Sequence, residues 1–166
     1  QIVAEEIGLD ATSIIAALLH DVVEDSDYTL EYIEEHFGEN VARIVNGLTK
    51  IAGLKKDMNN YSLQAVNFRK MLLTLNEDVR VILIKIADRY HNMMTLESMR
   101  PDKREKIASE TLYIYAPLAH RVGLYNIKTI LEDLALKYTQ PQVFEAIQSQ
   151  IRSQADNNQE YIENFK

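Results

Sequence analysis

Apolar residues recur every three or four positions along almost the whole chain, whereas strict alternation of apolar and polar residues is nearly absent. This pattern predicts an all-α protein. Only three Pro and five Gly interrupt it, and two of the Pro stand where helices are expected to begin. The expected helices follow Asp10, Thr29 and Gly38, and then cover residues 62–75, 78–97, 101–118, 124–138 and 141 onward.

The helix after Asp10 carries Ile14, Ile15, Leu18 and Leu19 on an apolar face that is too wide for a surface helix. We therefore expect this helix to be buried, with Asp10 as its N-cap.

No repeat or linker divides the chain, so we expect one domain over residues 1–156. Gly47, Gly53 and the polar residues 55–60 predict its longest irregular connection. Residues 157–166 are polar enough to be a fraying helix or the start of a connection to another domain. Because the chain opens without Met inside a helical pattern, we expect it to be a piece of a longer protein.

Composition narrows the class of protein. A chain of 166 residues, 46% of them hydrophobic, buries a core without needing a metal, so a metal would serve function. The absence of Cys excludes disulfides and favours the reducing cytoplasm, and the apolar runs are far shorter than the ~20 residues that cross a bilayer. The net charge of −7 argues against direct nucleic-acid binding, and an acidic protein that binds phosphate needs a cation.

Four polar groups crowd into six positions after the first apolar run: His20, Asp21, Glu24 and Asp25. If the helix continues, His20 and Glu24 share one stripe and Asp21 and Asp25 share the next. Carboxylates that repel one another in a poorly solvated place need a compensating cation, so the cluster is a candidate metal site. A solvated helix terminus is the alternative, although the helix dipole disfavours acids there.

Asp88 interrupts a segment, residues 81–92, that is apolar nearly all round a helix, so its carboxylate is expected to be buried or to line a cleft. Positions 84, 88, 92 and 95 fall on one stripe, so Asp88, Asn92 and Thr95 would project into the same space.

Two partners are open for Asp88. One is Arg89 or another buried basic residue, and the other is a cation shared with His20 and Asp21. His91 lies about 300° round the helix from Asp88, and we interpret it as a packed or half-exposed ring.

Arg121 and Tyr125 are four positions apart, a spacing that could place a guanidinium beside a phenol against an anion. Pairing with neighbouring helices is the alternative.

Together these residues resemble the N-terminal hydrolase domain of the RelA/SpoT-homologue family of alarmone enzymes, which belong to the HD-domain metallophosphohydrolases. The resemblance covers nearly the whole chain and rests on His20-Asp21 with Glu24-Asp25, and on residues 37–38, 45–50, 67–73, 87–93 and 115–121. It implies an all-α helical bundle that uses Mn²⁺ to remove the 3′-pyrophosphate from ppGpp or pppGpp, releasing pyrophosphate and GDP or GTP.

The resemblance also implies roles for single residues. His20, Asp21 and Asp88 correspond to metal ligands, and Glu24 and Asp25 to the acidic pair that activates and orients the attacking water.

Asn92 and Thr95 match positions that contact the nucleotide, and Arg121 with Tyr125 resembles a pair on the phosphate and sugar side of the pocket. Met94 stands where the family usually has Arg, which removes one cation near the phosphates.

The family has a further metal-ligating His on a preceding helix, and this sequence begins after it. In the full-length protein, synthetase and regulatory domains are expected to follow. Two other functions stay open: an HD phosphohydrolase that acts on other nucleotides, and a non-catalytic regulatory module that binds nucleotide.

Overall fold

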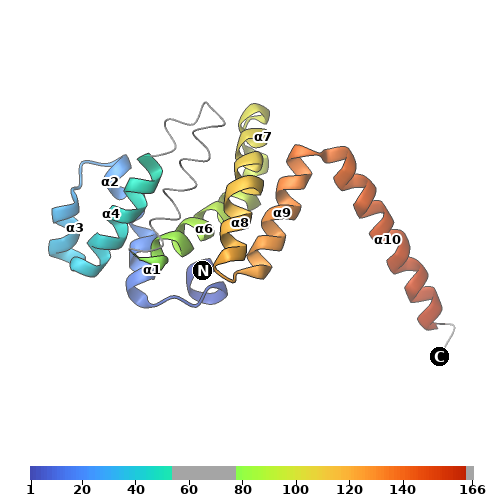
Figure 1. Cartoon of the computed structure of the whole chain (residues 1–166), viewed down its shortest axis with the longest axis horizontal. Coiled ribbons are helices and arrows are strands. Elements are labelled where there is room, and N and C mark those ends of the chain that lie inside the picture. The colour runs from blue at the N-terminus through green and yellow to red at the C-terminus, as the bar shows by residue number, and fades with distance from the viewer. Residues whose placement is uncertain (54–77, 164–166) are drawn as a thin grey trace. The chain divides into compact units, whose positions relative to one another are not determined.

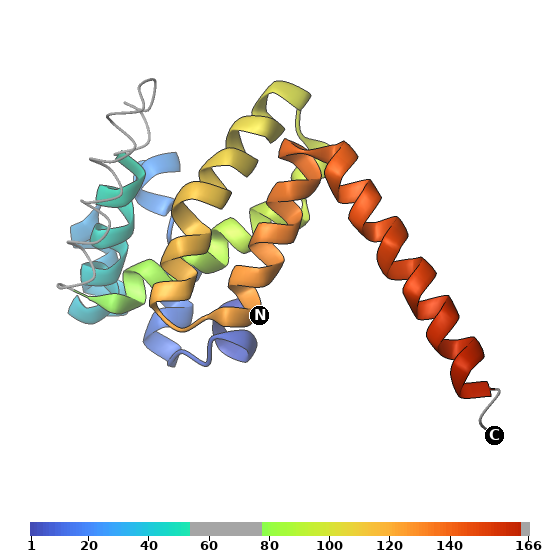
Figure 2. The ribbon, with the colours of Figure 1, turned by 45° about the vertical axis from the view of Figure 1, so that its right-hand side comes forward.

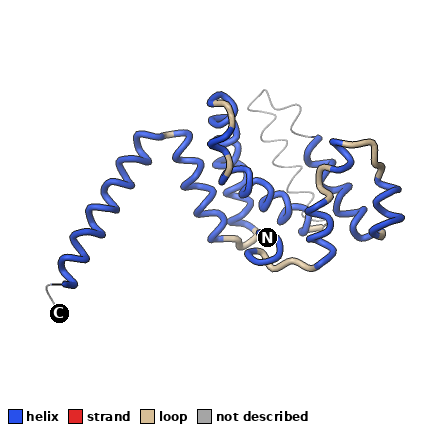
Figure 3. Tube along the Cα trace, turned by 180° about the vertical axis from the view of Figure 1, so that it is seen from behind, coloured by secondary structure: helices blue, strands red, loops and turns tan. Residues whose placement is uncertain are grey.

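The computed structural model describes residues 1–53 and 78–163, and every regular element in them is a helix (Figures 1 and 3). The all-α prediction is therefore confirmed. The chain forms two compact units, Gln1–His91 and Asn92–Lys166, with the boundary inside helix α6. The helix predicted over residues 62–75 and the connection over 55–60 lie outside the described residues.

Sequence-local caps set the ends of the first helices. The Asp10 carboxylate accepts a hydrogen bond from the Ser13 amide at 3.0 Å, and Thr29 caps the next long helix through the Tyr32 amide. Gly38 ends that helix with φ of +87°, a conformation that a Cβ disfavours. All three predicted boundaries are confirmed. The elements of the first unit are η1 (Ile2–Glu6), α1 (Ala11–Leu18), α2 (Val22–Asp25), α3 (Leu30–Phe37), α4 (Glu39–Gly53) and α6 (Val79–Met94).

The core of the first unit lies around α4 and α6. Helix α4 packs against α1 and α3, and its buried residues include Ile44 and Leu48. Gly47 lies inside α4 and not in the irregular connection that its presence predicted. The reason is close packing, because a Cβ on Gly47 would lie 2.7 Å from a methyl carbon of Val81 on α6.

Helix α1 is less buried than its sequence predicts. Ser13 and Ala16 are fully buried, but Ile15 is 36% exposed and Leu18 is 78% exposed. Two residues of the apolar face of α1, Ile14 and Leu18, line a cavity. The expectation of a buried helix was wrong because an apolar face can line a cavity as well as a core.

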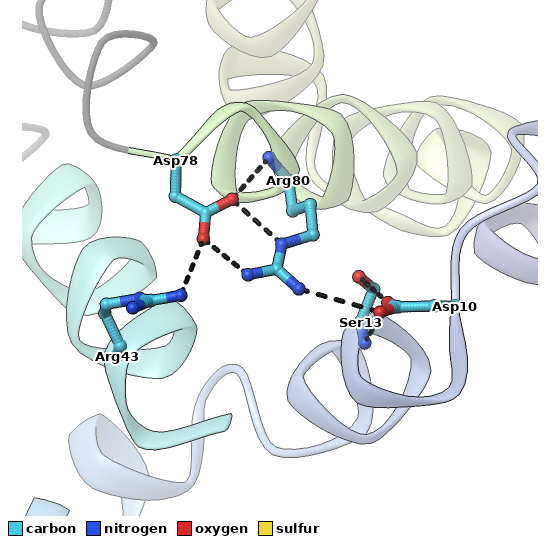
Figure 4. A network of polar contacts seen from close by, with 5 residues as sticks. All are labelled: Asp10, Ser13, Arg43, Asp78 and Arg80. Atoms are coloured by element: carbon cyan, nitrogen blue, oxygen red, sulfur yellow. Dashed lines mark hydrogen bonds and ion pairs between the residues drawn. The ribbon is translucent and has the colours of Figure 1, made fainter. Parts of the chain in front are cut away.

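A polar network ties the start of α6 to its neighbours, and we call Asp10, Arg43, Asp78 and Arg80 the helix-start cluster (Figure 4). The Arg80 guanidinium donates to both Asp78 oxygens, at 3.0 and 2.8 Å, and lies 3.6 Å from Asp10. Arg43 on α4 approaches Asp78 to 3.8 Å. The hydrogen bonds from Arg80 hold the pKa of the Asp78 carboxyl below its ordinary value.

The second unit packs α7 and α8 against α9, around the buried residues Leu118, Ile127 and Leu131. Helix α10 packs on the end of α9 and then diverges from it (Figures 1 and 2). No helix among the described residues has the length and apolar character needed to cross a membrane. The elements of the second unit are η3 (Leu96–Ser98), α7 (Pro101–Glu110), η4 (Thr111–Tyr115), α8 (Ala116–Arg121), α9 (Tyr125–Thr139) and α10 (Pro141–Glu163).

The helix predicted as continuous over residues 101–118 contains one turn of π-helix, η4, before α8. Pro117, two residues after this turn, has no amide hydrogen to donate, which disfavours an uninterrupted α-helical ladder. Helix α10 continues to Glu163, so residues 157–163 are helical. Whether they lead to a further domain stays a prediction.

Candidate functional site

His20 lies in a tight turn between α1 and α2, because α1 ends at Leu18. Its Nδ1 lies 2.8 Å from the Ala17 carbonyl oxygen, where a protonated Nδ1 donates a hydrogen bond. Such a bond fixes the tautomer and leaves Nε2 to face other groups. The helix therefore does not run from Ala11 through Asp25, and the predicted stripes of an unbroken helix are not formed.

Four side chains meet at this turn, and we call His20, Asp21, Lys85 and Asp88 the site cluster. His20 Nε2 lies 2.8 Å from Asp21 Oδ2 and 3.7 Å from Asp88 Oδ1. The Lys85 ammonium lies 3.1 Å from the other Asp88 oxygen, Oδ2. The fold thus brings the His-Asp pair of the first turn to the Asp of α6, as the hypothesis of a shared site requires.

Burial differs strongly across the site cluster. The side chain of Asp21 is 51% exposed, that of Asp88 is 18% exposed and that of Lys85 only 5%. Of the two partners left open for Asp88, a buried basic residue is present, and it is Lys85. The contact with His20 occurs together with this ion pair, so the two alternatives do not exclude each other.

A cavity of about 310 Å³ opens beside the site cluster, within the first unit. Its polar lining residues include His20, Asp88 and His91, set among apolar walls. The apolar and backbone lining comes from Ile14, Ala17, Leu18, Ile84, Ala87 and residues 1–4. An apolar pocket with a few polar groups at one end is typical of a small-molecule site.

His91 was interpreted as a packed or half-exposed ring and given no place at the candidate site. It is an exposed residue and lines the same cavity as Asp88. Residues three apart on a helix occupy adjacent rows, so an angle of about 300° is a separation of about 60° in the other direction. The spacing of three residues between Asp88 and His91 was therefore the sequence signal that both could line one cavity.

Glu24 and Asp25 occupy the short helix α2 and are both exposed. Their amides donate to the Asp21 carbonyl oxygen at 3.0 and 2.9 Å, which joins α2 directly to the turn that holds His20. The expected crowding in a poorly solvated place is therefore wrong for this pair, whose carboxylates have water to solvate them.

Asn92 continues the Asp88 stripe by one turn of α6, whereas Thr95 does not. Asn92 lies in the last turn of α6, but the helix ends at Met94, before Thr95. The Thr95 hydroxyl lies 3.4 Å from the Asn92 carbonyl oxygen. Both residues belong to the second unit.

Arg121 and Tyr125 lie on different helices, because Arg121 ends α8 and Tyr125 begins α9. The chain turns between them at Gly123, with φ of +81°. The Tyr125 ring contacts His120 edge-on, with ring centres 5.4 Å apart. The spacing of four therefore does not set the two side chains on one helical face, and their predicted substrate contacts stay predictions.

The donor set of the site cluster fits a divalent cation chemically. It offers one imidazole nitrogen and carboxylate oxygens from two residues, which suit cations such as Mn²⁺, Mg²⁺ or Zn²⁺. In the part of the chain that the structure describes, no group of three or more His, Cys, Asp or Glu side chains is arranged so that it could hold a metal ion. His20 Nε2 contacts Asp21 and Asp88 directly, and one Asp88 oxygen forms an ion pair with Lys85.

The fold and the His-Asp turn define the class of protein. The chain belongs to the HD domain family, whose profile matches residues 1–125. Hydrolases with this domain are metal-dependent, which agrees with the predicted need for a cation.

Relatives of known name match almost the whole chain. It is 49% identical over 96% of its length to guanosine-3′,5′-bis(diphosphate) 3′-pyrophosphohydrolase of Aquifex aeolicus. It is 48% identical over 95% to the bifunctional (p)ppGpp synthase/hydrolase SpoT of Escherichia coli K12, and 46% identical over 95% to GTP pyrophosphokinase of Myxococcus xanthus. The chain spans only 22%, 22% and 21% of these three proteins. The predicted resemblance to the RelA/SpoT homologues is confirmed.

Proposed function

We propose that the protein hydrolyses the 3′-pyrophosphate of ppGpp and pppGpp in a metal-dependent reaction that releases pyrophosphate and GDP or GTP. The observation that carries the proposal is the meeting of His20 and Asp21 with Asp88 beside a cavity. The name of the Aquifex relative supports the choice of substrate.

His20 through Nε2, Asp21 and Asp88 would hold the cation, which we propose to be Mn²⁺. When bound, the cation lowers the pKa of a water molecule and stabilises negative charge on phosphoryl oxygens. The bond from Nδ1 to the Ala17 carbonyl orients His20 for this role. Asp88 is held on a buried stretch of α6, so its carboxylate needs little reordering.

Glu24 and Asp25 act on the water in this proposal. The water oxygen adds to the phosphorus that carries the 3′ oxygen, and the bond from that phosphorus to the 3′ oxygen breaks. GDP or GTP is the leaving group, its 3′ oxygen takes up a proton from solvent, and the attacked phosphorus keeps the water oxygen in the released pyrophosphate. Glu24 accepts the proton that the water loses, and Asp25 orients the water. Both carboxylates are exposed on α2, immediately after the His-Asp turn, so they are accessible to water and substrate.

We propose that Asn92 and Thr95 contact the nucleotide, and that Arg121 and Tyr125 contact its phosphates and sugar. Arg121 is exposed, so its guanidinium is accessible to a ligand. We propose that the protein is cytoplasmic and that synthetase and regulatory domains lie beyond this chain; the greater length of the relatives supports the further domains.

The test is release of pyrophosphate from ppGpp in the presence of Mn²⁺, with and without a chelator. We expect release that the chelator abolishes and that added Mn²⁺ restores. Parallel assays with GTP and dGTP separate an alarmone hydrolase from an HD phosphohydrolase of other specificity. No release from ppGpp, with the protein folded and Mn²⁺ bound, would contradict the proposal.

The second candidate is a regulatory module that binds the nucleotide without hydrolysing it. The Myxococcus relative favours this candidate, because its name describes the synthesis reaction and not the hydrolysis. Calorimetric titration with ppGpp distinguishes the two: binding without release of pyrophosphate supports the regulatory module.

A further inference from the structure

Lys85 is a nearly buried ammonium in the middle of α6. Its side chain is 5% exposed, and its Nζ lies 3.1 Å from Asp88 Oδ2. Lys is almost never buried without a partner, because removing its charge from water is costly. The pair therefore combines a buried cation with a residue that we propose as a metal ligand.

The charges of the site cluster show what this pairing does. Asp21 and Asp88 each contribute one negative charge, and Lys85 contributes one positive charge beside Asp88. A carboxylate whose negative charge is partly neutralised by an ammonium attracts a second cation less strongly. The ammonium also repels that cation directly.

We infer that Lys85 weakens the binding of the divalent cation at Asp88 and so keeps that cation exchangeable. The inference rests on the proposed metal site and adds to it a residue that sets its affinity.

A purely orienting role for Lys85 is less well supported by the packing. Ile86 and Ala87 precede Asp88 and are 0% and 4% exposed, and Tyr90 and Met93 follow it and are 7% and 0% exposed, so α6 is held firmly on both sides of Asp88. The backbone of Asp88 is thus fixed without Lys85. What Lys85 adds is a charge, and in bulk water one unit charge close to a divalent ion already changes its affinity by about tenfold.

The experiment is titration of the purified protein with Mn²⁺, followed by the electron paramagnetic resonance signal of free Mn²⁺. Lys85→Met and Lys85→Gln remove the charge, and Lys85→Arg keeps it. Lys128→Met is the matched control, because it makes the same change in net charge at an ion pair with Glu132 on α9. We expect Kd for Mn²⁺ to fall by about tenfold or more in the Met and Gln variants, and to stay near the wild-type value in Lys85→Arg and Lys128→Met. Unchanged or weaker binding in the Met and Gln variants would overturn the inference.

Thermal melting provides a second measurement, and a merely structural role of Lys85 does not predict its expected result. Without Mn²⁺, Lys85→Met should melt below wild type, because Asp88 loses its ammonium partner while 18% exposed. Added Mn²⁺ should raise the Tm of this variant more than that of wild type. If Lys85→Met does not fold, Lys85→Gln, which keeps a polar donor, decides the outcome by the same two measurements.

Failure of the inference and failure of the proposed function give different results. If wild type binds Mn²⁺ and the charge-removing variants bind it more tightly, but ppGpp is not hydrolysed, the inference stands and the proposed function fails. If ppGpp is hydrolysed but the variants bind Mn²⁺ like wild type, only the inference fails. A wild-type protein that does not bind Mn²⁺ overturns both.

Discussion

Two clusters of charged residues lie along α6, and they differ in how their charges are balanced. The helix-start cluster pairs two carboxylates, Asp10 and Asp78, with two guanidinium groups, Arg43 and Arg80. The site cluster sets Asp21 and Asp88 against one ammonium and one imidazole. It also lies beside a cavity and is followed directly by the carboxylates of α2.

The difference separates a structural role from a functional one. In the helix-start cluster, both Asp78 oxygens accept hydrogen bonds from Arg80, so the carboxylate needs nothing from outside the chain. In the site cluster, negative charge exceeds the fixed positive charge, and donor atoms face a space that can admit a ligand. Charged residues are therefore most informative about function when the fold does not neutralise them.

The largest expected effect tests the carboxylates that follow the site cluster. Glu24→Gln should lower kcat for pyrophosphate release by about 10²- to 10⁴-fold, because the amide cannot accept the proton from water. Steady-state kinetics with saturating Mn²⁺ measures this change. Glu34→Gln, an exposed residue on the neighbouring helix α3, is the control and should leave kcat unchanged. Equal rates for Glu24→Gln and wild type would remove Glu24 from the mechanism.

The second effect separates the two clusters most directly. Asp88→Asn should weaken Mn²⁺ binding by more than about 100-fold, because loss of an outer partner alone costs about 10- to 100-fold. Asp78→Asn is the matched control on the same helix and should bind Mn²⁺ like wild type. Calorimetric titration measures both, after metal-free melting curves show that each variant is folded. Unaltered binding in Asp88→Asn would return Asp88 to an internal ion pair with Lys85.

The third effect concerns stability and acid pH. Asp78→Asn should lower the free energy of unfolding at pH 7 by about 1–3 kcal/mol, because a charged hydrogen-bond acceptor is lost. The folded pKa of Asp78 lies below its ordinary value of about 3.9. Its stabilisation is therefore present above about pH 4 and is lost as the pH falls through the folded pKa.

Wild type should thus lose more stability than Asp78→Asn when the pH falls from about 4 towards 2. Urea unfolding at several pH values measures the difference, and Asp102→Asn on α7, whose Arg100 partner is 76% exposed, is the control. Parallel pH profiles for wild type and Asp78→Asn would show that the pair with Arg80 contributes nothing to folding.

The smallest effect tests the packing that holds α6 against α4. Gly47→Ala gains up to about 1 kcal/mol of helix propensity but introduces a methyl group that clashes with Val81, at about 1–3 kcal/mol. We expect a net destabilisation of about 1–2 kcal/mol, measured by thermal or urea unfolding. A more stable variant would show that Val81 moves aside without cost.

Sequence periodicity and caps predicted most of the fold, because both depend on residues that are close along the chain. Asp10, Thr29 and Gly38 set helix ends as expected, through bonds or backbone conformations that span at most a few residues. The π-helical turn before Pro117 and the place of Gly47 inside α4 were missed. Each depends on a property that hydrophobic periodicity does not report. For the π-helical turn it is the missing amide hydrogen of Pro117, and for Gly47 it is the close contact with Val81 on α6.

The sequence by itself determined the helical class, the family and the residues with the chemistry of a metal site. The tertiary structure alone decided which of them meet. It broke the first helix at Leu18, so that His20 turns toward Asp88, and it made Lys85 the partner that the sequence left open. It also placed His91 on the cavity. The physical reason is that helix formation is local, whereas an ion pair or a cavity depends on how segments distant in sequence pack together.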